Sequence, residues 1–150
     1  ALGGGSAIDA QTPPTPSFIH LHLGIVADGL SEEALSSIHH IVVPSWEHLT
    51  QPQSTVFVSI PSIIDPSLAP PGRHVIHAYL PATEPYQLWE GVERGTAEYD
   101  QLKRERAECL YSAIEQFIPD IRDRVELEMI GSPLTHERFL NRHRGTYGPE

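Results

Sequence analysis

The sequence predicts an α+β fold: a mixed, mostly antiparallel sheet of about five strands with one long helix and a short C-terminal helix. Three observations lead to this fold class. Residues 17–25 alternate in polarity with a period of two. Three further short runs rich in β-branched residues follow. The one long segment with helical periodicity comes only after them, which favours antiparallel pairing with the helix on one face.

The first strand is predicted at residues 17–25. Its two faces differ: Ile19, Leu21, Leu23 and Ile25 share one face, whereas Phe18, His20, His22 and Gly24 share the other. Residues 1–16 contain a Gly3-Gly4-Gly5 run followed by three prolines, so they predict a flexible, proline-rich lead.

The next three strands are predicted from β-branched runs that end at prolines or turns. They are residues 38–43, which stop at Pro44, residues 55–60, and residues 74–80, which stop at Pro81. Residues 61–72 contain four prolines and predict a rigid, irregular connection.

The long helix is predicted at residues 97–118, with Thr96 as its N-cap and Pro119 as its end. A short helix or turn is expected before it, at residues 85–91. Asp120 is expected to cap one more turn, and residues 126–130 to form a fifth strand at an edge.

The C-terminal region predicts a short helix capped by Thr135, with Leu134 and Phe139 forming a hydrophobic staple. Residues 142–148 follow as a basic, glycine-containing loop. Glycine permits close approach of the backbone to a ligand, and arginine suits phosphate or carboxylate. The residues alone favour the simpler interpretation, a helix end whose basic side chains interact favourably with the helix dipole.

Composition limits the classes of partner. The 150 residues carry a formal net charge of −10, which argues against a nucleic-acid partner. No apolar run approaches the ~20 residues that span a bilayer. The single cysteine, Cys109, excludes an internal disulfide, and its place in a predicted helix favours a buried, inert thiol.

His20 and His22 lie two residues apart on one strand face, a spacing that can chelate a metal with a third ligand from His39, His40 or His77. No cysteine cluster or HExxH motif accompanies them, so the sequence favours hydrogen-bonded sheet histidines and predicts no metal site. The sequence also lacks the GxSxG motif of a serine hydrolase, although Ser59 and Ser62 lie near a strand end.

Both faces of the second to fourth strands carry apolar or aromatic residues, among them Val43, Phe57 and Tyr79. If the helix covers one face, the other can line an apolar pocket or pack against a second domain. Either way, we expect the second face not to be bare to water.

Four stretches closely resemble the carotenoid isomerase (prolycopene isomerase) family, within the phytoene desaturase-like flavoproteins. They are SFIHLHLGIVADGL, IHHIVV, VFVSIPSIIDPSLAPPGRHVIHAYLPATEPYQLWEG and GSPLTHERFLNRHRGTYGP. The resemblance runs from about Ser17 to Pro149. It implies a two-domain FAD-dependent enzyme, of which residues 17–150 are a fragment of the substrate domain that lacks the Rossmann FAD-binding domain.

The resemblance further implies cis–trans isomerisation of poly-cis lycopene with reduced FAD. The implied partners are the apolar polyene and the missing FAD-binding domain. The implied location is the plastid or the cyanobacterial cytoplasm, with a peripheral membrane association. We expect this chain alone to hold no FAD and to be inactive.

Site residues follow from the same resemblance. Gly145, Tyr147 and Gly148 are expected at the junction of flavin and substrate, and Arg144 and His136 on the substrate side, where they orient the loop. No catalytic acid or base can be named from the sequence.

Two other interpretations remain open. One is a stand-alone, non-catalytic interaction or scaffold module derived from this fold, for example in a photosynthetic membrane complex. The other is a related desaturase or retinol saturase-like reductase.

Overall fold

A computed structural model describes residues 14–148 as one sheet with helices packed on one of its faces. The strands are β1 (Ser17–Val26), β2 (His39–Val42), β3 (Val56–Ser59), β4 (Arg73–Glu84) and β5 (Val125–Gly131). The helices are α1 (Ala97–Ile114), α2 (Ile121–Arg124) and α3 (Pro133–Leu140). The predicted order of elements and the α+β fold class are confirmed. The predicted lead falls largely on residues 1–13, outside the described residues.

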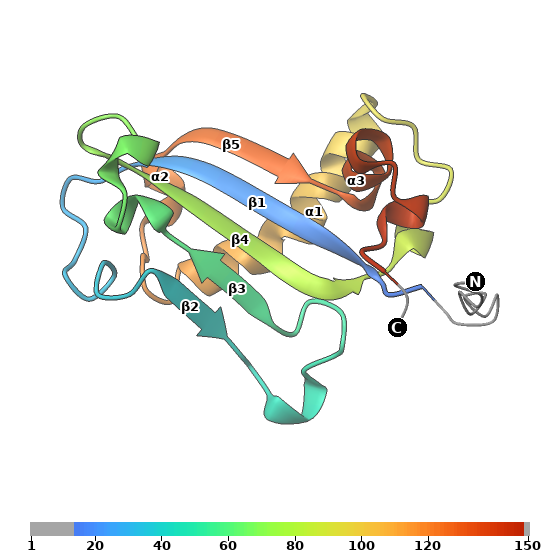
Figure 1. The fold of residues 1–150 in the computed structure, drawn as a ribbon, viewed down its shortest axis with the longest axis horizontal. Coiled ribbons are helices and arrows are strands. Elements are labelled where there is room, and N and C mark those ends of the chain that lie inside the picture. The colour runs from blue at the N-terminus through green and yellow to red at the C-terminus, as the bar shows by residue number, and fades with distance from the viewer. Residues whose placement is uncertain (1–13, 149–150) are drawn as a thin grey trace, which may run out of the picture.

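The strands lie in the order β2-β3-β4-β1-β5, and all four pairings are antiparallel. The central strand β1 pairs with β4 on one side and with β5 on the other. As predicted, β5 is an edge strand. In Figure 1, α1 runs behind the sheet, and α3 with the C-terminal loop lies at the N-terminal end of β1.

The core lies between the sheet and α1. The alternating residues of β1 that were predicted to share a face, from Ile19 to Ile25, are at most 2% exposed. They pack with Leu110 and Ile114 of α1 and with buried residues of β3 and β4. Period-two alternation on the strands and helical spacing on α1 therefore identify the same apolar layer.

Two predicted element boundaries were wrong. β4 does not stop at Pro81 but continues to Glu84. Between the pairs Ile19–Leu80 and Ser17–Glu84, residues 81–83 lie opposite Phe18 alone. Pro81 is therefore accommodated in a β-bulge, where the ladder does not need its missing N–H. The second error is smaller: α1 ends at Ile114, not at residue 118.

The predicted start of the last helix was also wrong. Ser132 is the N-cap of α3, and Thr135 is its third helical residue. The Ser132 N–H donates a hydrogen bond to Thr135 Oγ1 at 3.1 Å, as in a capping box. The predicted staple is absent from the described residues, because Leu134 is 8% exposed whereas Phe139 is 67% exposed. Phe139 instead lies beside the guanidinium groups of Arg94 and Arg138.

Candidate functional site

The sheet face opposite α1, here called the outer face, carries a row of aromatic and imidazole rings. Phe57, Tyr79 and His20 stand side by side on β3, β4 and β1, because register pairs Phe57 with Tyr79 and Tyr79 with His20. The ring centroids of Phe57 and Tyr79 are 5.5 Å apart, and so are those of Tyr79 and His20. Phe18 extends the row, with its centroid 5.6 Å from that of His20. The outer face therefore carries a row of stacked aromatic and imidazole rings.

The outer face becomes aliphatic toward β5. Leu127 and Met129 are each 57% exposed there. They line a shallow hollow of about 260 Å³ together with His22, Gly24, Pro61, Val75 and His77. Exposed apolar side chains gathered on one sheet face are typical of a surface that binds an apolar molecule or another protein surface.

Three histidines form the polar part of the outer face. His22 lies directly opposite His77 across the β1–β4 ladder, with the rings stacked at a centroid distance of 4.3 Å. His20 Nδ1 and His77 Nε2 are 2.8 Å apart and share a hydrogen bond. Burial lowers the pKa of His20 to about 3, helped by the neighbouring imidazoles of His136, His77 and His22. Burial also lowers the pKa of His77 to about 4, so these rings are neutral at physiological pH.

His136 and Tyr147 connect the C-terminal loop to this face. The ring of His136, a buried residue of α3, meets the rings of both His20 and Tyr147 edge-on, at centroid distances of 5.0 Å and 5.3 Å. The Tyr147 ring also packs on Phe18 at 4.4 Å. The structure thus brings together two of the sequence-derived site residues at the β1 N-terminal end of the outer face.

Gly145 serves the internal packing of the loop. Its φ is +64°, and a Cβ added there would lie 2.5 Å from the carbonyl oxygen of Pro133 and 2.8 Å from Ser17 Oγ. Ser17 also donates a hydrogen bond to the Gly145 carbonyl at 2.8 Å. Gly148, in contrast, has open space on the side where a Cβ would point. Of the two glycines, Gly148 is the one beside which a ligand can approach the backbone.

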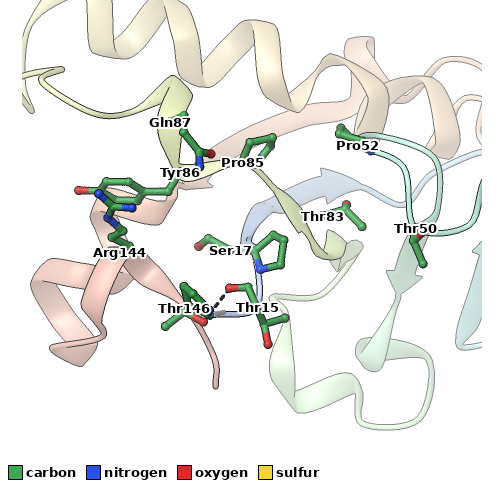
Figure 2. A pocket seen from close by; sticks show the side chains of 12 residues that line it. Thr15, Ser17, Thr50, Pro52, Thr83, Pro85, Tyr86, Gln87, Arg144 and Thr146 are labelled. Atoms are coloured by element: carbon green, nitrogen blue, oxygen red, sulfur yellow. Dashed lines mark hydrogen bonds between the residues drawn. The ribbon is translucent and has the colours of Figure 1, made fainter. Parts of the chain in front are cut away.

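Arg144 points away from the aromatic row. Its guanidinium lies over the ring of Tyr86, 5.5 Å from the centroid, and pairs with Glu90 at 3.3 Å. Figure 2 shows Arg144 and Tyr86 at one edge of a cavity of about 300 Å³, with the Thr146–Thr15 hydrogen bond below them. The structure therefore separates Arg144 from His136 and Tyr147.

The cavity in Figure 2 contains a residue that sequence reasoning missed. Thr83 lies in its wall, and its hydroxyl is buried with no hydrogen-bond partner among the described residues. Nothing local in the sequence points to Thr83, because the cavity forms only where the C-terminal loop folds back on the start of β1. Thr15 N donates to the Gly148 carbonyl at 3.0 Å at this junction.

Ser59 and Ser62, the two serines considered for a hydrolase, each contact a histidine, and both contacts are structural. Ser62 Oγ lies 2.8 Å from His74 Nδ1 and accepts the Val75 N–H at 3.1 Å. Ser59 Oγ lies 2.9 Å from His39 Nδ1 on the neighbouring strand. Within residues 14–148 no carboxylate is hydrogen-bonded to either histidine, so neither pair has the third member of a hydrolase triad.

Comparisons with known proteins give a consistent set of relatives. The chain is 38% identical over 136 residues to a chloroplastic prolycopene isomerase of an Oncidium hybrid cultivar, and 37% identical over the same length to that of Arabidopsis thaliana. Each match covers 89% of this chain and 22% of the relative. All-trans-retinol 13,14-reductase of Rattus norvegicus is 33% identical over 101 residues, which is 63% of this chain and 17% of that protein. The chain thus spans about a fifth of the length of the curated relatives it matches. No family model matches it.

Proposed function

Because this chain is homologous to one segment of the prolycopene isomerases, we propose that it forms a substrate-facing wall of a carotenoid isomerase-like enzyme. The observation that carries this proposal is the outer face, where half-buried stacked rings adjoin exposed aliphatic side chains on the side of the sheet away from α1. That face is the part of the described structure suited to a long apolar ligand.

The substrate class follows from the names of the relatives and from the chemistry of the face. Prolycopene and all-trans-retinol, which those names contain, are both conjugated polyenes. A polyene chain has no polar handle, so its binding depends on apolar area, at about 25 cal/mol per Å². Phe57, Tyr79, Val75 and Leu127 supply such area. We assign to this wall the poly-cis form of lycopene.

A flavin is part of the proposed enzyme. The described residues could line one side of a flavin site, but they could not hold the dinucleotide itself. Every strand pairing is antiparallel, so residues 14–148 contain no βαβ unit to hold a dinucleotide diphosphate. The row of rings on the outer face offers apolar area to a flavin ring or a polyene. Reduced FAD, held by another part of the enzyme, supplies the electron chemistry of the isomerisation.

The residues of this chain then bind the polyene, orient it and exclude water from it. Tyr147 and His136 close the end of the aromatic row, and Gly145 allows the loop to pack tightly enough to hold them there. Gly148 leaves space beside the backbone at the same end. Arg144 has a different role. Its contacts with Tyr86 and Glu90 hold the C-terminal loop from the opposite side.

The proposed location is the plastid, at the membrane periphery, as for an enzyme whose substrate partitions into lipid. The relatives from Oncidium and Arabidopsis are chloroplastic. Among the residues that the structure describes, no helix has the length and apolarity needed to cross a bilayer.

A chimaera tests the proposed function. Residues 14–148 would replace the matching segment of the Arabidopsis thaliana prolycopene isomerase, and the products formed from poly-cis lycopene would be separated by chromatography. We expect isomerised lycopene of unchanged mass. A product heavier by two hydrogens would identify a reductase instead, and a folded, flavin-containing chimaera with no product would favour a non-catalytic module.

A further inference from the structure

The three histidines of the outer face are placed by strand register to act together. His20 and His22 are two residues apart on β1, so both point to the outer face, and His77 of β4 lies directly opposite His22. Each of the three offers one ring nitrogen, and these atoms all lie within 4.8 Å of one another. Within the described residues, this is the one group of three or more histidine, cysteine or acidic side chains so arranged.

The surroundings of the group suit metal ligation more than ion pairing. Besides His22 and His77, the rings that pack against His20 are those of Phe18, Tyr79 and His136. Its Nδ1 lies 2.8 Å from His77 Nε2, so these two nitrogens are close enough to share an ion after a small rearrangement. His22 is exposed, and its cross-strand neighbour on β5 is Met129. A metal ion binds the neutral form of such imidazoles.

We propose that His20, His22 and His77 form a binding site for a divalent transition-metal ion of the zinc class. Three neutral imidazoles with one side open to solvent are a ligand set for Zn²⁺, Co²⁺ or Ni²⁺, whereas Mg²⁺ and Ca²⁺ require oxygen ligands. The open side lies toward His22 and leaves a coordination position for water or another ligand. This proposal departs from the sequence prediction, which favoured hydrogen-bonded sheet histidines without a metal.

Ligation requires a local rearrangement that the outer face permits. Bond lengths of 2.0–2.1 Å place tetrahedral ligand nitrogens about 3.4 Å apart. The stacked rings of His22 and His77, 3° from parallel, must therefore turn toward a common point. His22 is exposed and free to turn. The hydrogen bond between His20 and His77 is then replaced by two bonds to the ion.

Titration of the untagged 150-residue chain with Co²⁺, after removal of metals with EDTA, tests the site. We expect one equivalent of Co²⁺ per chain, visible d–d absorption of a four- or five-coordinate centre, and displacement of this band by Zn²⁺. His22→Ala should weaken binding by more than about 100-fold, beyond the effect typical of losing an outer-shell partner. His77→Gln should do the same.

His39→Ala is the matched control. His39 lies on the same row of the sheet, but its Nδ1 is engaged with Ser59, and it is outside the group. This variant should bind Co²⁺ like the parent chain. Absence of saturable binding in the folded parent, or equal affinity in parent and His22→Ala, would overturn the proposal. The result is independent of isomerase activity, because the assay measures only metal binding.

Discussion

At the scale of single residues, Gly145 and Gly148 differ in their surroundings although the sequence presents both as loop glycines. Gly145 has a positive φ and no room for a Cβ, whereas Gly148 has space. We expect Gly145→Ala to lower the free energy of unfolding by about 2–4 kcal/mol, from left-handed strain and overpacking. Urea unfolding followed by circular dichroism measures this change.

Gly148→Ala is the control for that measurement, and it should change the free energy of unfolding by less than about 0.5 kcal/mol. Equal stability of the two variants would contradict the packing role assigned to Gly145.

His20 predicts a pH dependence of stability. Its pKa is about 3 in the folded chain and about 6.5 when unfolded, so below neutral pH the unfolded state takes up the proton first. The free energy of unfolding should therefore fall as the pH drops, by about 2 kcal/mol from this group between pH 7 and pH 5. The rings of His22, His77 and His136 face it and contribute to the shift.

Urea unfolding in the presence of EDTA at several pH values measures this dependence. His20→Phe should flatten the curve. A curve of the same slope in parent and His20→Phe would show that His20 is not the group responsible.

The sequence predicted correctly which residues share a strand face, because the backbone period determines this. It did not predict which residues of different elements meet, because the tertiary fold determines that. Period two placed His20 and His22 on one face, as found. The period could not show that the third histidine beside His20 and His22 is His77, and not His39 or His40, because this depends on the β1–β4 register. Nor could it separate Arg144 from Tyr147, which lie three residues apart but face opposite sides of the loop.

At the scale of elements, the end of β4 is joined to α1 by a buried ion pair. The Glu84 side chain is 0% exposed and accepts hydrogen bonds from Arg106 and from Trp89 Nε1, the latter at 2.9 Å. Sequence patterning assigned neither Glu84 nor Arg106 to the core, because a charged residue on a helix is normally solvated. Their pairing depends on β4 continuing past Pro81, which the sequence argued against.

Loss of one partner should therefore be costly. Arg106→Met leaves the Glu84 carboxylate buried without its cation, and we expect a loss of about 3–5 kcal/mol in the free energy of unfolding. The double variant Glu84→Gln/Arg106→Met should recover most of that loss, because the neutral amide still accepts from Trp89. A double variant no more stable than Arg106→Met would contradict this assignment. Urea unfolding of the variants decides it.

At the scale of the whole molecule, the two faces of the sheet have different roles. The face against α1 is a closed core, and its residues on β1 are those that the sequence predicted to share one face. The outer face carries Ile41, Leu127 and Met129 at 57–59% exposure. The sequence predicted an apolar second face, and these exposed side chains lie on it.

An uncovered apolar face should make the isolated chain associate. We expect the 150-residue chain to bind an apolar fluorescent dye and to self-associate at micromolar concentration. The double variant Leu127→Glu/Met129→Glu should reduce both effects, whereas Leu88→Glu, at a site 45% exposed in the short helical turn after β4, should not. Analytical ultracentrifugation and dye fluorescence measure these effects. A parent chain that is monomeric and binds no dye would favour a self-contained module.

Isomerisation by the chimaera most directly tests the claim that the outer face is the polyene wall. Leu127→Glu/Met129→Glu places carboxylates where the proposed substrate lies, and a carboxylate cannot be desolvated there without a partner. We predict that this variant forms isomerised lycopene at least about 10-fold more slowly than the parent chimaera, a barrier increase of about 1.4 kcal/mol or more. Leu88→Glu should retain the parent rate. An unchanged rate in Leu127→Glu/Met129→Glu would contradict the account.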